Sequence, residues 1–99
     1  MTKNQIIDIL SSNKTKLSEY GVRYISLFGS YYKDSATKDS DIDFLVKFKY
    51  NQKSFENYMD LKFFLEDKIN KKIDLVIEEN IKTELKEEIL KNSEILISF

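Results

Sequence analysis

The stretch Leu27–Phe48, LFGSYYKDSATKDSDIDFLVKF, decides how the rest of the chain is read. It joins two apolar, β-prone segments through Gly29-Ser30 and a polar loop, and the second segment opens with Asp41 and Asp43. Because successive side chains of a strand point to opposite faces, these two carboxylates share one face of the predicted strand. Carboxylates on one face repel each other, and a cation between them is the simplest reason to keep both.

Composition restricts the chemistry available to the 99 residues. The chain has no cysteine and no histidine, which excludes disulfides, thiolate zinc sites and histidine-based catalysis. Any metal must bind oxygen ligands, which favours Mg²⁺, Mn²⁺ or Ca²⁺. A net charge of −1 argues against stable nucleic-acid binding, and no apolar run is long enough for a signal peptide or a membrane span. We therefore expect one cytoplasmic domain over residues 1–99.

Helical and extended patterns alternate along the chain. Apolar periodicity predicts helices over residues 3–20, 55–70 and about 80–91, and β-prone runs predict strands over residues 22–28, 41–48 and 72–77. Residues 31–34 could form a short helical turn, and the apolar tail 95–97 could form an edge strand or part of an interface. This order indicates an α/β or α+β domain with a small mixed β-sheet flanked by helices.

Caps and apolar stripes support these helices. Thr2 with Gln5 resembles a capping box, Gly21 suits the left-handed end of the first helix, and Ser54 and Asn80 are candidate N-caps. The residues expected to face the core are Ile6, Leu10 and Leu17 in the first helix, Phe55, Tyr58, Leu61, Leu65 and Ile69 in the second, and Ile81, Leu85 and Ile89 in the last.

The residues around Gly29 predict a phosphate site beside a metal site. Gly29 lets the backbone approach a ligand closely, and Ser30 offers a hydroxyl and an N–H next to it. Asp74, on the strand expected at residues 72–77, adds a third carboxylate to Asp41 and Asp43. Three carboxylates beside a phosphate are what two-metal phosphoryl transfer requires. Taken singly, however, a Gly-Ser is usually only a turn, and an Asp-x-Asp is more often an exposed polar face.

Together these residues form a motif that resembles a known family. Gly29-Ser30, ten intervening residues and Asp41-Ile42-Asp43 are similar to the signature of the DNA polymerase β-like nucleotidyltransferases, and nearly the whole chain resembles their minimal nucleotidyltransferase (MNT) domains. The resemblance implies that Gly29 and Ser30 hold the nucleotide phosphates. It also implies that Asp41 and Asp43 bind Mg²⁺, two ions in all, and that Asp74 completes the metal site or serves as the base.

One part of the family pattern is different here. Members commonly carry Arg-x-Arg-Gly after the Gly-Ser, whereas this chain has Tyr31, Tyr32, Lys33 and Asp34. Lys33 could replace one arginine as a point charge that binds nucleotide, although it lacks the bidentate fork. Tyr31 or Tyr32 could either stack on a nucleobase or pack into the core.

The resemblance also implies a function. Stand-alone MNT proteins typically are antitoxins of HEPN-domain RNase toxins and transfer AMP from ATP to a tyrosine hydroxyl of the toxin. Our leading hypothesis is therefore a Mg²⁺-dependent protein adenylyltransferase with ATP as substrate. One alternative is a non-catalytic antitoxin that masks the toxin by binding, and another is a nucleotidyltransferase that modifies a small molecule such as an antibiotic. A chain this short leaves little to bind an acceptor, so the acceptor is expected to bring its own surface.

Overall fold

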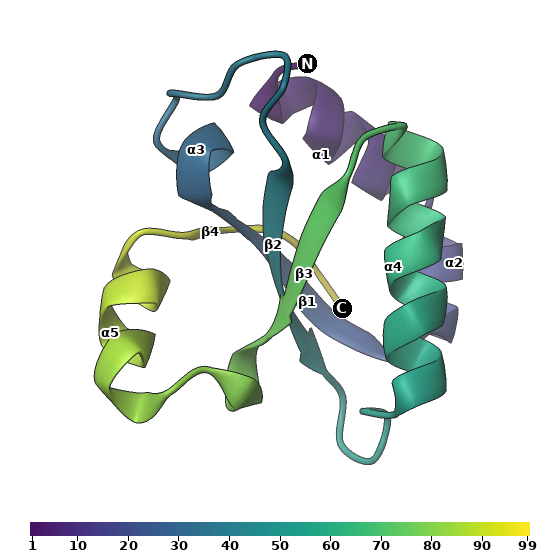
Figure 1. The fold of residues 1–99 in the computed structure, drawn as a ribbon. Coiled ribbons are helices and arrows are strands. Elements are labelled where there is room, and N and C mark those ends of the chain that lie inside the picture. The colour runs from purple at the N-terminus through teal and green to yellow at the C-terminus, as the bar shows by residue number, and fades with distance from the viewer.

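The computed structural model describes residues 1–99 and is built around a four-stranded sheet in the order β3-β2-β1-β4 (Figure 1). β1 pairs antiparallel with both β2 and β4, whereas β2 and β3 run parallel, so the sheet is mixed as expected. The strands are β1 (Val22–Phe28), β2 (Ile42–Phe48), β3 (Ile73–Ile77) and β4 (Glu94–Ser98). The helices are α1 (Lys3–Ser12), α2 (Lys14–Glu19), α3 (Gly29–Tyr32), α4 (Phe55–Ile69) and α5 (Thr83–Lys91), with a 3₁₀ turn, η1 (Glu78–Asn80).

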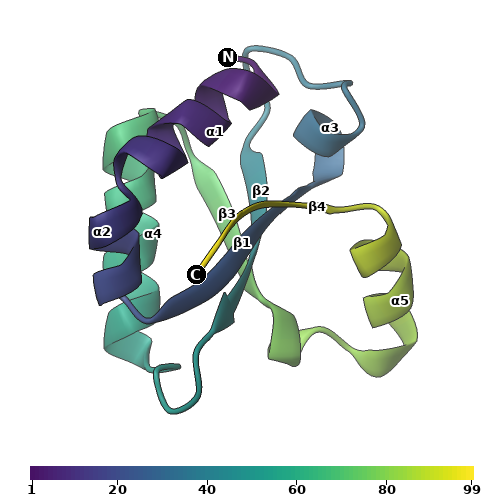
Figure 2. The same ribbon diagram turned by 180° about the vertical axis from the view of Figure 1, so that it is seen from behind.

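The hydrophobic core lies between one face of the sheet and three helices. α1, α2 and α4 gather on that face, as Figures 1 and 2 show from opposite sides. The helices contribute Ile6, Leu10, Leu17, Leu61, Leu65 and Ile69, and the strands contribute alternate residues that include Ile25, Leu27, Ile42, Phe44, Val46, Ile73 and Leu75. The alternation sends Asp43 and Asp74 to the opposite face, which these helices do not cover.

The predicted helix over residues 3–20 is wrong, because the chain forms two helices that meet at Asn13. The Asn13 Nδ2 donates to the Ile9 carbonyl over 2.7 Å, and its backbone N–H bonds to the Leu10 carbonyl over 3.1 Å. These local bonds satisfy the end of α1 and offer the backbone an alternative to a continuous helix. The apolar period continues through the break, since Leu17 of α2 is buried as expected.

The helical turn after β1 begins earlier than predicted. α3 spans Gly29–Tyr32, so it starts directly at the end of the strand and not at residue 31. β2 begins at Ile42, one residue later than predicted, which leaves Asp41 just outside the strand. The local geometry therefore distinguishes Asp41 from Asp43, although the sequence pattern treats them alike.

Three expectations for the C-terminal half are also wrong. Phe55 does not join the core stripe of α4, because it is the first residue of the helix and its side chain is 79% exposed. Asn80 lies in η1 and does not cap α5, whose N-cap is Lys82 with no side-chain hydrogen bond. α5 contains no buried residue, and Leu85 is 51% exposed. The predicted inward face of α5 fails because the helix stands away from the core, on the other side of the sheet (Figure 1).

The remaining sequence signals for caps and ends are confirmed. Thr2 and Gln5 form the reciprocal capping box, and the Ser54 hydroxyl accepts from the backbone N–H of Asn57. Gly21 has a φ of 77°, in the left-handed region that favours glycine. The apolar tail forms the edge strand β4. None of the helices is both long enough and apolar enough to span a membrane.

Candidate active site

Gly29 and Asp43 meet where β1 ends and β2 begins. Phe28 is paired with Asp43 across the antiparallel ladder, so the backbone of Gly29 emerges beside the Asp43 side chain. A Cβ atom built on Gly29 would lie 2.0 Å from the Asp43 Oδ2, and Gly29 also has a φ of 71°. Position 29 therefore requires glycine, because the Asp43 carboxylate occupies the space where the Cβ atom of any other residue would lie. Asp43 is the side chain that the sequence suggests as a metal ligand.

Asp43 and Asp74 lie side by side on the open face of the sheet. They are paired in the parallel register of β2 and β3, which places their Cα atoms about 5 Å apart. Asp43 is half-buried and Asp74 is exposed. Burial, together with the negative charges of Asp74 and Asp41, raises the pKa of Asp43 above the ordinary aspartate value. The structure thus brings together two of the three predicted carboxylates from strands that are distant in sequence.

Asp41 completes this acidic surface from the loop that precedes β2. It is exposed, and its charge reaches Asp43 strongly enough to contribute to the raised pKa. The three side chains do not form a preassembled cage, because no group of three or more acidic side chains is close enough to hold a metal ion. The donor set nevertheless fits Mg²⁺: the ligands are hard carboxylate oxygens, and their mutual repulsion would be relieved by a cation.

Ser30 and Lys33 lie next to this acidic surface. The Ser30 backbone carbonyl accepts from the Ser35 N–H over 2.9 Å, which ties α3 to the following loop. Lys33 is exposed and lines a pocket of about 220 Å³ together with Gly29 and with Glu88 and Asn92 of the α5 region. The pocket therefore lies between α3, which follows the end of β1, and the C-terminal end of α5.

The two tyrosines of α3 face the core. Tyr31 is buried in the core cluster, and Tyr32 is partly buried against it. The sequence left open whether these tyrosines stack on a nucleobase or pack into the core, and in this structure both pack against the core. The only arginine, Arg23, lies near the start of β1, at the other end of the strand from Gly29.

The whole length of the chain resembles known proteins. Residues 4–99 match the family model described as polymerase beta, nucleotidyltransferase. The chain belongs to the polymerase β nucleotidyltransferase family. A protein adenylyltransferase, MntA of Thermococcus cleftensis, is 35% identical over 92 residues, which are 92% of each chain. The protein is therefore a nucleotidyltransferase enzyme, as the motif predicts.

Solved structures support the fold of this nucleotidyltransferase. One described as a minimal nucleotidyltransferase superposes with a TM-score of 0.82 at 24% identity and covers 95% of each chain. A toxin–antitoxin structure with AMP-PNP gives a TM-score of 0.70 at 24% identity, covering 100% of this chain and 75% of the other. A third, from a tri-AMPylated HEPN toxin of Shewanella oneidensis in complex with its MNT antitoxin, gives 0.63 at 21% identity, covering 94% and 73%. The predicted polymerase β-like fold is confirmed.

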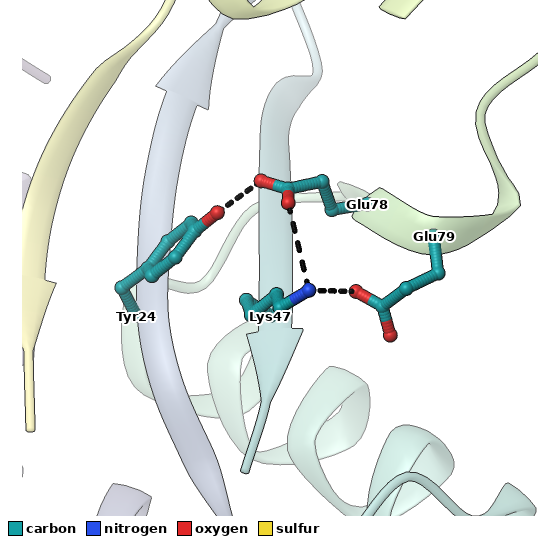
Figure 3. A network of polar contacts seen from close by, with 4 residues as sticks. All are labelled: Tyr24, Lys47, Glu78 and Glu79. Atoms are coloured by element: carbon teal, nitrogen blue, oxygen red, sulfur yellow. Dashed lines mark hydrogen bonds and ion pairs between the residues drawn. The ribbon is translucent and has the colours of Figure 1, made fainter. Parts of the chain in front are cut away.

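A polar network that no sequence motif indicates lies on the same face of the sheet as Asp43 and Asp74 in this nucleotidyltransferase. Figure 3 shows the Tyr24 hydroxyl donating to the Glu78 carboxylate, while the Lys47 ammonium lies 3.9 Å from Glu78 and 3.3 Å from Glu79. Glu78 is 7% exposed, and burial and this hydrogen bond raise the pKa of the Tyr24 phenol. Through these contacts η1 is bonded to β1 and β2, just before the segment that leads to α5. No local signal identifies it, because 54 residues separate Tyr24 from Glu78.

Replacing Tyr24 with phenylalanine is expected to loosen that segment of the nucleotidyltransferase. The change removes the hydroxyl and leaves the largely buried Glu78 carboxylate with one distant cation, at a cost of about 1–3 kcal/mol in the free energy of unfolding. Hydrogen exchange should quicken in residues 78–91, because η1 loses its tie to β1. Tyr50→Phe is the matched control, since Tyr50 is 91% exposed and makes no side-chain hydrogen bond. Equal exchange in both variants would show that the network does not hold η1.

Proposed function

We propose that this nucleotidyltransferase is an antitoxin that transfers AMP from ATP to a tyrosine hydroxyl of a partner HEPN RNase toxin, with Mg²⁺. The observation that carries the proposal is the placement of Asp43 and Asp74 side by side, with Gly29 against the Asp43 carboxylate. The relative named protein adenylyltransferase MntA supports protein as the acceptor. The toxin–antitoxin structures with AMP-PNP and with an AMPylated HEPN toxin support an adenine nucleotide and a toxin partner.

The proposed site residues form two groups, one for the metal and one for the nucleotide phosphates. Asp41, Asp43 and Asp74 would hold the metal, and Gly29, Ser30 and Lys33 would hold the triphosphate, with the Ser30 hydroxyl and the Lys33 ammonium as donors. Bound Mg²⁺ supplies charge neutralisation at the phosphates and alignment of the attacking and leaving oxygens. Lys33 and Gly29 line one pocket together with Glu88, and this hollow at Gly29, whose backbone lies against the Asp43 carboxylate, supports the proposal that the triphosphate binds there.

The transfer balances as a displacement at the α-phosphorus of ATP. The acceptor hydroxyl oxygen forms the new bond to the α-phosphorus, and the bond from that phosphorus to the bridging oxygen of pyrophosphate breaks. The hydroxyl proton must pass to a base. With no histidine in the chain, a carboxylate takes this role, and we assign it to the exposed Asp74. The protein's contribution is to position the groups and to neutralise charge.

The test is the intact mass of the neighbouring gene's product, taken as the toxin under test, after incubation with this protein, ATP and Mg²⁺. We expect a gain of one or more AMP units, with the modified residue located by peptide mapping to a tyrosine. A reaction with the acceptor tyrosine changed to phenylalanine serves as the control. Modification of an aminoglycoside in the absence of any protein acceptor would instead identify a small-molecule transferase.

One observation favours a second candidate, an antitoxin that acts by masking. Tyr31, at the first arginine position of the family pattern, packs into the core, and Lys33, at the second, is the only cation that lines the pocket at Gly29. Weak nucleotide binding is the expected consequence. Masking predicts that the Asp41→Asn, Asp43→Asn double variant still co-purifies with the toxin and still protects cells from it. Loss of protection with the complex intact would assign neutralisation to the chemistry.

A further inference from the structure

A second concave surface lies at the opposite end of β1 and β2 from Asp43. It is a hollow of about 460 Å³ whose lining includes the cations Arg23, Lys47, Lys49 and Lys53, the aromatic Tyr50 and one carboxylate, Glu79. We call it the basic pocket. Lys47 follows Asp43 by four positions along β2, a distance of about 13 Å. The basic pocket is therefore distinct from the proposed adenylyl-transfer site.

The charges of the basic pocket are only partly balanced. Lys47 pairs with Glu79 and more distantly with Glu78, whereas Arg23, Lys49 and Lys53 have no carboxylate within 4.0 Å. Cations that converge on one hollow repel each other and create a local positive potential that attracts anions. The guanidinium group offers a planar fork that matches a phosphate. The net charge of −1 does not reveal this pocket, because acidic residues elsewhere on the chain offset the positive charge of its cations.

An aromatic side chain, that of Tyr50, lines the basic pocket beside these cations. Tyr50 follows β2 in the turn that leads to Asn51, whose φ is 62°, and its side chain is 91% exposed. A cationic groove with a free aromatic ring is the combination that binds nucleotides, because phosphates pair with the cations and a base stacks on the ring. An acidic peptide would use the cations and leave the ring without a partner. The ring is the observation that favours a nucleotide.

We propose that the basic pocket binds a phosphate-bearing nucleotide unit, either a free nucleotide or one end of a single-stranded RNA. The phosphates bind Arg23, Lys49 and Lys53, and the base stacks on Tyr50. This binding requires neither the metal nor the carboxylates at Gly29. It can therefore be measured without nucleotidyl transfer, and its failure leaves the proposed transfer untouched.

The test is fluorescence anisotropy of a labelled short oligouridylate titrated with the protein in the presence of EDTA. Three phosphate contacts give a slope of log affinity against log salt of about −2, at about −0.7 per contact for single strands. The triple variant Arg23→Gln, Lys49→Gln, Lys53→Gln should bind at least tenfold more weakly, with a flatter slope. Tyr50→Ala should lose about tenfold, whereas Tyr50→Phe keeps the ring and the affinity.

A charge-matched control separates the pocket from general electrostatics. Lys14→Gln, Lys16→Gln, Lys68→Gln makes the same charge change at exposed positions of α2 and α4, on the other face of the sheet. This variant should bind as the parent does, with circular dichroism confirming that both triple variants are folded. Competition then identifies the source: displacement by uridine monophosphate indicates a free nucleotide, and displacement by unlabelled oligouridylate alone indicates an RNA end. The proposal is overturned if the parent does not bind, if both triple variants bind alike, or if oligoglutamate competes equally and Tyr50→Ala has no effect.

Discussion

Replacing Asp43 with asparagine is expected to abolish nucleotidyl transfer and, at neutral pH, to raise the Tm of the metal-free protein. Asp43 is the half-buried member of the carboxylate group and is aligned with Asp74 across β2 and β3. An amide is a poor Mg²⁺ ligand and does not neutralise charge at the phosphates. Losing several kcal/mol of transition-state stabilisation corresponds to a rate loss of about a thousandfold or more. Transfer is measured as release of pyrophosphate and as mass gain on the toxin.

The effect on stability follows from the raised pKa of Asp43. The folded protein holds the Asp43 proton at a higher pH than the unfolded chain does, since burial and the charges of Asp74 and Asp41 disfavour the carboxylate. The contribution of Asp43 to stability therefore falls as the pH rises from the ordinary aspartate pKa through the raised one. The amide of the Asp43→Asn variant does not ionise and lacks this penalty. The Tm difference between variant and parent should be small at low pH and reach its full value at neutral pH.

An exposed aspartate provides the control for both measurements. Asp67 lies on the outer surface of α4, and Asp67→Asn makes the same chemical change away from the acidic surface. It should leave the transfer rate and the pH dependence of Tm unchanged. Retained transfer in Asp43→Asn would refute the metal assignment, and a lower Tm at neutral pH would refute the account of repulsion.

Gly29→Ala is expected to remove transfer almost as completely, through the position of Asp43. The added Cβ would lie 2.0 Å from the Asp43 Oδ2 and 2.9 Å from its Cγ, so the carboxylate must move. A φ of 71° costs alanine about 1–2 kcal/mol more in the folded state. We expect a lower Tm together with a rate loss of about a hundredfold, because small displacements of a catalytic group reduce rates by about this factor.

Gly21→Ala separates the strain from the displacement. Gly21 also has a positive φ, 77°, and its added Cβ would lie 2.5 Å from the Gln52 Cβ, so the turn that holds Gln52 must shift, far from Asp43. Both variants should therefore lose stability, measured by urea unfolding. Only Gly29→Ala should lose transfer at a temperature where both are folded. Equal activity losses would mean that Gly29 matters for folding and not for the placement of Asp43.

The sequence predicts the sheet well because its strands carry strong local signals. β1, β2 and β3 are runs of β-branched and aromatic residues, and their bounds differ from the prediction by one residue at most. Asn13 is harder to interpret, since an asparagine within a long apolar period can face solvent or end the helix. α5 is the clearest failure. Its apolar period is helical, but no local pattern reveals that the helix stands away from the core.

The candidate site is predictable residue by residue but not as an arrangement. Gly29, Ser30, Asp41 and Asp43 form a motif in sequence, whereas Asp74 joins them only through the register of two parallel strands separated by α4. That register joins two strands on either side of α4, so no short sequence window contains it. The Tyr24–Glu78 bond and the basic pocket depend on long-range contacts in the same way.

The pairing of β4 with β1 affects how this sheet can assemble. Tyr24 is paired with Ser98, so the edge of the sheet next to β1 is completed by a segment that is far from β1 in the sequence. During synthesis β1, β2 and β3 can pair before β4 has emerged, and the strands that carry Asp43 and Asp74 come together first. Until then β1 keeps one unpaired edge, the kind of surface through which nascent chains aggregate. Contacts this distant in sequence slow folding.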